Sequence, residues 1–166
     1  PQEEIALLLA PGEIRVWEMR IPHRPVPPDR ATTIARMDGA EHLTACRAYW
    51  RGKLDNAASF DIPEQRIAEM VRAGLLHLDL IAYGREPSGT IAPCIGVYCP
   101  IGSESSPIIQ FFDSMGLHAL AERALQYFLD KQHEDGFIQN FGGYMLETGA
   151  ALFTMAEHFR YTRDTR

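Results

Sequence analysis

The apolar pattern at the start of the chain has a period of two. Every second position is apolar in two short runs, which are Ile5, Leu7 and Leu9, and then Ile14, Val16 and, with looser spacing, Met19. Such spacing is typical of β-strands, and Pro11-Gly12 between the runs is a turn signal. Residues 1–21 are therefore predicted to form a short β-hairpin. Because two strands alone are marginal in water, we expect them to complete a sheet with strands from elsewhere.

A proline-rich segment separates these strands from the rest of the chain. Four prolines fall within residues 22–28. Proline disfavours both helix interiors and central strands, and it favours stiff, extended linkers. We interpret residues 22–36 as a linker and a domain boundary, followed by a helical domain over residues 37–166.

From residue 37 onward the apolar positions follow a helical period. The predicted helices span residues 39–57, 63–83, 107–116, 117–132 and 144–161. Asp61 is placed to cap the second helix, and Pro63 lies in its first turn, where a missing N–H costs little. Between these helices lie an irregular stretch at 84–106, with a short strand at 94–98, and a glycine-rich connection at 135–143. The fold class is thus mainly α, with a short N-terminal β-hairpin.

Composition narrows the function classes. The chain has 166 residues, of which 46% are hydrophobic and 23% charged, and a net charge of -6. This charge disfavours nucleic acid, whose phosphates need a basic face. Apolar runs fall short of the ~20 residues that span a bilayer. The motifs of zinc proteases, nucleotide-binding loops and serine hydrolases are absent from the sequence, so no metal or cofactor is expected.

The cysteines and the first residues leave two questions open. Cys94 and Cys99 lie close enough for a local disulfide, while buried thiols are the alternative interpretation for these two and for Cys46. The sequence begins at Pro1 without a methionine or a targeting segment. We therefore expect a piece of a longer polypeptide and make no prediction of its localisation.

Several short motifs resemble six-hairpin glycosidases. AYWR at residues 48–51, FDIPE at 60–64 and RAGL at 72–75 look like the junction where a β-sandwich leads through a linker helix into an (α/α)6 toroid. The second half is similar to hairpin repeats of that toroid, through DSMG at 113–116, AERAL at 121–125, QHEDG at 132–136, ETG at 147–149 and HFRYTRD at 158–164. α-L-Rhamnosidases belong to this group. The resemblance implies a partial toroid after the end of a β-sandwich.

The resemblance also implies a site. In such toroids a sugar-binding funnel is lined by the loops that precede the inner helices, which here would be the helices at 107–116 and 144–161. A glycosidase needs two carboxyl groups across its cleft, and Glu104 and Glu147 are the acids that this placement brings together as catalytic candidates. The expected substrate-binding residues are Tyr98, Asp113, Gln139, Asn140 and Tyr144. For both glutamates, capping the helix dipole is the competing interpretation.

We thus expect part of a glycoside hydrolase that acts on an oligo- or polysaccharide and that is inactive in isolation. The alternative is a non-catalytic helical scaffold, in which hairpins stack as in a solenoid. A third interpretation, compatible with either, is a homodimer that covers exposed helix faces.

Overall fold

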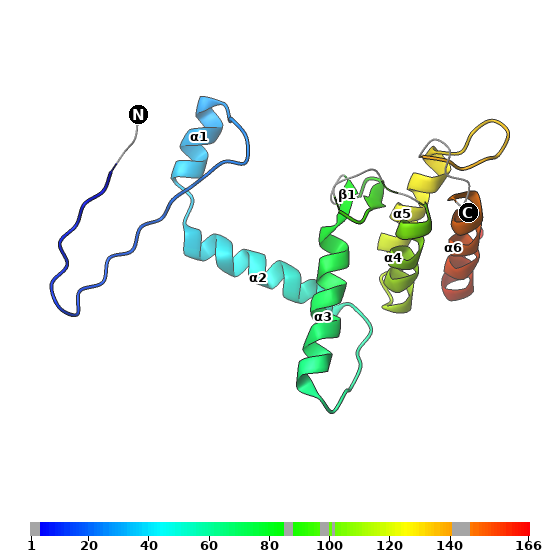
Figure 1. The fold of residues 1–166 in the computed structure, drawn as a ribbon, viewed down its shortest axis with the longest axis horizontal. Coiled ribbons are helices and arrows are strands. Elements are labelled where there is room, and N and C mark those ends of the chain that lie inside the picture. Colours follow the sequence, from blue (N-terminus) through cyan, green and yellow to red (C-terminus); the bar gives the residue numbers. More distant parts are fainter. Residues whose placement is uncertain (1–3, 85–87, 97–99, 101, 141–146) are drawn as a thin grey trace. The chain divides into compact units, whose positions relative to one another are not determined.

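The chain divides into two compact units, Pro1–Arg47 and Ala48–Arg166. The computed structural model (Figure 1) describes residues 4–84, 88–96, 100, 102–140 and 147–166. The first unit holds an extended N-terminal segment and helix α1, and the second holds the main hydrophobic core. The boundary between the units falls within helix α2, which contributes to both.

The N-terminal segment is extended but unpaired. Residues 4–21 contain a turn at Ala10–Glu13, closed by a 3.0 Å bond from the Glu13 N–H to the Ala10 carbonyl, and they form no β-ladder. Pro11 and Gly12, with φ of 81° at Gly12, fit the central positions of a type II turn. A type II turn splays its flanking strands. The strands predicted for this segment therefore do not pair with each other, and the two-stranded sheet of the described residues lies elsewhere.

Part of the predicted linker is helical. Helix α1 spans Pro28–Ala35 and begins with proline in its first turn. There the missing N–H is harmless and the fixed φ suits a helix. The run of prolines thus ends in a helix start, whereas the prediction carried the linker through to residue 36.

Asp38 caps helix α2, which spans Gly39–Asp55 and agrees with the helix predicted at 39–57. One Asp38 carboxylate oxygen accepts the N–H groups of Ala40 at 2.8 Å and Glu41 at 3.0 Å. The backbone bonds from Glu41 and Ala40 hold the pKa of Asp38 below its usual value of 3.8.

This cap should depend on pH. Because the pKa is lower in the folded state, the cap's contribution is complete above about pH 4 and is lost as the pH falls through the folded pKa. Amide hydrogen exchange at Ala40 and Glu41 should therefore speed up towards pH 3, beyond the intrinsic effect of pH. Asp38→Asn should remove this pH dependence, and its persistence in the variant would contradict the assignment.

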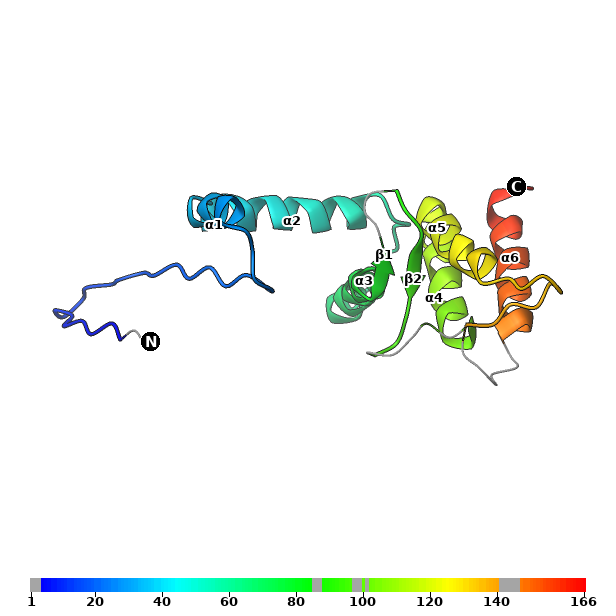
Figure 2. The same ribbon diagram turned by 90° about the horizontal axis from the view of Figure 1, so that it is seen from above.

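The second unit contains helices α3 to α6 and a two-stranded sheet. Helix α3 spans Gln65–Leu80, α4 spans Gly102–Ser114, α5 spans His118–Asp130 and α6 spans Glu147–Thr162. Strands β1, Ala82–Gly84, and β2, Ile91–Pro93, pair antiparallel, with Tyr83 opposite Ala92. In Figures 1 and 2 the sheet lies between α3 and α4, and α6 lies on the far side of α4. The mainly helical fold class is confirmed.

Several boundaries in this unit differ from the prediction. Helix α3 ends at Leu80, before the predicted residue 83, because the chain turns into β1. The strand of this region spans Ile91–Pro93; of the strand predicted at 94–98, residues 94–96 form none and 97–98 lie outside the described residues. Helix α4 starts at Gly102, five residues before Pro107, which lies inside it. The extra turn is anchored by side chains: the Ser105 hydroxyl donates to the Pro93 carbonyl and the Ser106 hydroxyl to the Gly102 carbonyl.

Helices α4 and α6 lie parallel and in register. The Gly102 N–H donates to the Glu147 carboxylate at their N-terminal ends, and Asp113 contacts His158 near their C-terminal ends. Both pairs are separated by 45 residues in sequence. Helix α5, which connects them in sequence, contacts both. Their apolar faces form one core with residues of α3 and the sheet, including Leu75, Ile91, Ile109, Phe112, Ala121, Phe128 and Ala151.

Candidate functional site

The N-terminal ends of α4 and α6 meet at the buried carboxylate of Glu147. This side chain is 2% exposed. One carboxylate oxygen accepts the Gly102 N–H at 3.0 Å, and the other accepts the Asn140 N–H at 2.6 Å. Backbone donors at a helix start favour an anion through both hydrogen bonding and the helix dipole. Glu147 thereby joins the start of α4 to the loop that precedes α6.

Hydrogen bonds to the segment before α4 and to the first turn of α6 fix the described part of that loop. The Asn140 side-chain amide donates to the Pro100 carbonyl at 2.8 Å. Thr148 bonds both backbone groups of Ile138 through its hydroxyl, at 3.0 Å each. Ile138 is itself buried in the core. The segments before the two parallel helices are therefore fixed against each other by side-chain to backbone bonds.

Four of the seven predicted site residues belong to this end of the helices. Glu104 lies in the first turn of α4, two residues beyond Gly102, and is partly buried. Gln139 and Asn140 lie in the loop, and Glu147 opens α6. Tyr98 and Tyr144 lie outside the described residues. The catalytic roles of Glu104 and Glu147 stay predictions.

Close packing at this end requires glycine at position 102. A Cβ added there would lie 2.9 Å from the Glu147 Cα and 3.0 Å from its Cβ. Gly102→Ala should therefore cost about 1–3 kcal/mol of folding free energy, since neither backbone can yield easily. The matched control is Gly149→Ala in α6, where an added Cβ meets nothing within 4 Å.

The control should be stabilised by about 0.5–1 kcal/mol, because alanine is the better helix former. Urea unfolding followed by helical circular dichroism compares the two variants. Equal effects at both positions would contradict the close approach of α4 and α6.

Asp113 lies apart from this group. It is near the C-terminal end of α4, about 16 Å along the helix from Gly102 at 1.5 Å per residue. Its side chain is completely buried, and its Oδ1 lies 2.9 Å from Nδ1 of both His118 and His158. The structure thus separates Asp113 from the other predicted site residues by most of the helix.

The cluster of Asp113, His118 and His158 was missed from the sequence, where the histidines look scattered. A carboxylate that accepts both Nδ1 protons fixes the ring orientation of each imidazole and leaves Nε2 on the outer side. His118 is the more accessible, at 41% side-chain exposure, and its ring lies 6.0 Å from that of Tyr161. Asp113 and His158 are 45 residues apart, the same separation as Gly102 and Glu147, because α4 and α6 pack in register.

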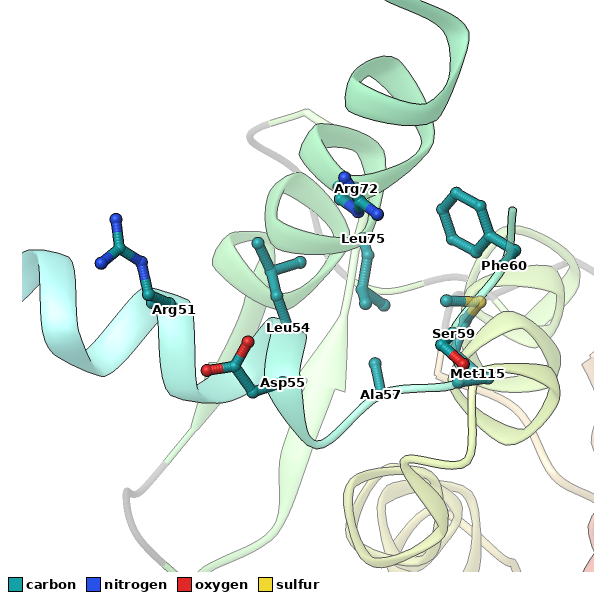
Figure 3. Close-up of a pocket in the computed structure, with 10 residues that line it drawn as sticks. Arg51, Leu54, Asp55, Ala57, Ser59, Phe60, Arg72, Leu75 and Met115 are labelled. Atoms are coloured by element: carbon teal, nitrogen blue, oxygen red, sulfur yellow. The ribbon is translucent and has the colours of Figure 1, made fainter. Parts of the chain in front are cut away.

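A hollow of about 450 Å³ lies between the end of α2, the following loop, α3 and the turn after α4. Figure 3 shows Arg51 and Asp55 on the α2 side and Arg72 on α3, with Phe60 across from them. The Arg72 guanidinium lies 5.5 Å from the centre of the Phe60 ring. The volume of this hollow is in the range of small-molecule sites. The remaining lining residues are Leu54, Ala57, Ala58, Ser59, Leu75 and Met115.

A second hollow, of about 460 Å³, borders His118 and includes Lys53 and Tyr49 of α2. Lys53 is 3.0 Å from the Asp79 carboxylate. Burial acts to lower the pKa of Lys53, but the hydrogen bond and charge of Asp79 outweigh it and raise this pKa above its usual value. Lys53 is therefore cationic at neutral pH and already neutralised by Asp79.

Within the described ranges, no three histidine, cysteine, aspartate or glutamate side chains are grouped to hold a metal ion. Each helix in that part of the chain is too short or too polar to cross a bilayer. Cys46 is a free, exposed thiol; Cys94 is buried against the Ile81 carbonyl, and Cys99 lies outside the described residues. The chain matches no family model, no curated protein and no solved structure.

Proposed function

We propose that this chain is a helical-hairpin part of a carbohydrate-active protein, acting with further hairpins on glycosidic bonds of an oligo- or polysaccharide. The supporting observation is the parallel, in-register packing of α4 and α6, connected in sequence by α5, which runs in the opposite direction (Figure 1) and contacts both. This is the arrangement expected of successive inner helices in a hairpin toroid. It brings the polar residues that precede both helices to one end.

The composition of that end suits a sugar. Glu104, Gln139 and Asn140 supply carboxylate and amide groups, which pair with hydroxyls as donors and acceptors. Glu147 makes two backbone bonds and fixes the segments that carry these groups. Glu104 is the carboxyl group of this set that does not bond the Gly102 or Asn140 backbone, and hydrolysis by a carboxyl pair would take its second acid from the further hairpins.

Oligosaccharide binding tests the proposal more directly than activity, because the chain is expected to be inactive alone. Nitrogen-15 NMR titration with rhamnose-terminated and other neutral oligosaccharides should shift the amides of Gly102, Glu104 and Asn140. Glu104→Gln should weaken binding by about fivefold or more, as expected when one charged hydrogen-bond partner is lost. Glu69→Gln on the exposed face of α3 is the matched control and should leave binding unchanged.

Two results would overturn the proposal. One is a set of saturable shifts confined to another part of the chain. The other is the absence of shifts up to about 10 mM sugar, which is well above a millimolar dissociation constant.

The second candidate function is a non-catalytic scaffold. Its supporting observation is an apolar face on α6, where Leu152, Phe153 and Phe159 are each 40–58% exposed. Such a face fits stacking against another helical hairpin. If Phe153→Lys abolishes association with other hairpins while oligosaccharides shift no amide, the scaffold interpretation replaces the first.

A further inference from the structure

The largest exposed apolar surface of the described residues is the N-terminal segment. Between residues 5 and 21, nine large hydrophobic side chains are 47–95% exposed: Ile5, Leu7, Leu8, Leu9, Ile14, Val16, Trp17, Met19 and Ile21. Monomeric proteins rarely leave contiguous apolar patches larger than about 300–600 Å² uncovered. A surface of this kind therefore indicates an interaction.

The backbone of this segment points to β-pairing as the mode of interaction. Residues 4–9 and 14–21, called the two arms here, flank the type II turn and have strand-like lengths. Ion pairs between Glu13 and Arg15 and between Glu18 and Arg20 join positions two apart, as expected where alternate side chains share one face. Since the arms do not pair with each other, their N–H and C=O groups are available to another strand.

We propose that two copies of this chain associate through these arms, with the arms of one copy pairing with those of the other in a four-stranded sheet. Two strands are marginal in water, whereas three or more with an apolar face are stable. One copy supplies two strands and two copies supply four. The arms carry two arginines and two glutamates, which cancel, so repulsion between the two copies is small.

The area of the surface decides between the arms and the apolar face of α6. At roughly 60–120 Å² for each large aliphatic side chain, the nine exposed residues offer on the order of 600 Å² of apolar surface per copy. A stable interface buries about 800 Å² per partner, of which about 57% is apolar, or roughly 450 Å². The apolar face of α6 offers roughly 200 Å² by the same measure. The arms therefore suffice for a dimer, and the α6 face alone does not.

Sedimentation equilibrium of the full chain over roughly 1–200 μM, where interfaces of this size begin to associate, should show a monomer–dimer equilibrium. The double variant Ile14→Lys, Val16→Lys should raise the dissociation constant about 100-fold, or about tenfold for each buried side chain. The matched control, Leu152→Lys with Phe153→Lys on α6, should change it by less than about threefold. Both variants replace exposed side chains, and helical circular dichroism should confirm that the second unit stays folded.

Hydrogen exchange supplies an independent readout, because dimerisation by β-pairing should slow the exchange of amides at 4–9 and 14–21. A chain that is monomeric throughout the range would overturn the proposal. So would a dimer that the α6 variant dissociates and the arm variant does not. Open-ended assembly without a dimer plateau, or a dimer whose arm amides exchange as fast as those of the monomer, would also overturn it.

Discussion

Asp113→Asn should lower the free energy of unfolding by about 3–5 kcal/mol, the cost of removing one partner from a buried ionic group. The wild-type carboxylate is completely buried and accepts Nδ1 protons from both His118 and His158. Asp113 Oδ1 alone contacts both imidazoles, so asparagine with its oxygen at that position keeps both contacts but places its NH2 group where Oδ2 lies, 3.0 Å from Nδ1 of His158. A donor then faces a donor beside the buried His158, and both imidazoles lose their charged partner.

The effect is measured by urea unfolding at pH 7, followed by circular dichroism at 222 nm. Asp61→Asn is the matched control, since Asp61 lies on the exposed loop before α3, and its substitution should cost less than about 0.5 kcal/mol. A loss below about 1 kcal/mol for Asp113→Asn would show that the cluster is solvated in solution.

The two histidines are predicted to contribute unequally. His158 is buried on α6, whereas His118 is 41% exposed at the start of α5. A double-mutant cycle of Asp113 with each histidine should therefore give the larger coupling to His158, within the range of about 0.5–3 kcal/mol for residues in contact. Equal couplings would mean that burial does not decide the strength of these bonds.

Hydrophobic periodicity in the sequence was sufficient to predict the helices that form the core. The period of α5 and α6 and the stop at Gly116, whose φ is +78°, gave boundaries within a few residues of those observed. The mainly helical class followed from these elements. Periodicity reports which side of an element is buried, and these helices bury one side each.

The misplaced boundaries have a common cause in side-chain to backbone bonds from distant residues. Helix α4 extends upstream of Pro107 because Pro93 and Glu147 supply partners to its first turn. Neither residue is near in sequence, so a local rule that starts helices at proline misses them. Likewise, the arms read as strands from their alternation, but a ladder needs a partner that this segment does not supply to itself.

The candidate site was predicted only in part, because contacts between residues distant in sequence do not show in local periodicity. Glu104, Asn140 and Glu147, which the resemblance places together, lie at the N-terminal ends of the parallel helices α4 and α6, and their roles stay predictions. Asp113 was named because an acid between Phe112 and Met115 in the same helix is expected to be partly buried, but a helix of 13 residues separates its two ends by about 16–20 Å. Of its two imidazole partners, His118 is five residues away in sequence, whereas His158 is 45 residues away and is brought to Asp113 by the packing of α6 on α4.

Glu147→Gln should cost about 2–4 kcal/mol and should loosen the end of the helices where the candidate site lies. The wild-type carboxylate accepts two backbone N–H groups, from Gly102 and Asn140, and bonds to a charged acceptor contribute about 1.5–3 kcal/mol each. Glutamine has one carbonyl oxygen, so its NH2 group must face the other N–H. Because the substitution preserves the shape and volume of the side chain, the loss of folding free energy measures the contribution of the charge and of the second acceptor.

Glu157→Gln on the same helix is the matched control, because its pairing with Arg160 is a surface contact that contributes less than about 1 kcal/mol. Urea unfolding measures the global loss, and hydrogen exchange at Gly102 and Asn140 measures the local one. If Glu147 mainly fixes the loops, both amides exchange faster and oligosaccharide binding weakens together with the loss of order. If stability is unchanged within about 0.5 kcal/mol while binding is lost, the Glu147 carboxylate acts on the ligand itself. That result would favour the catalytic assignment over the structural one.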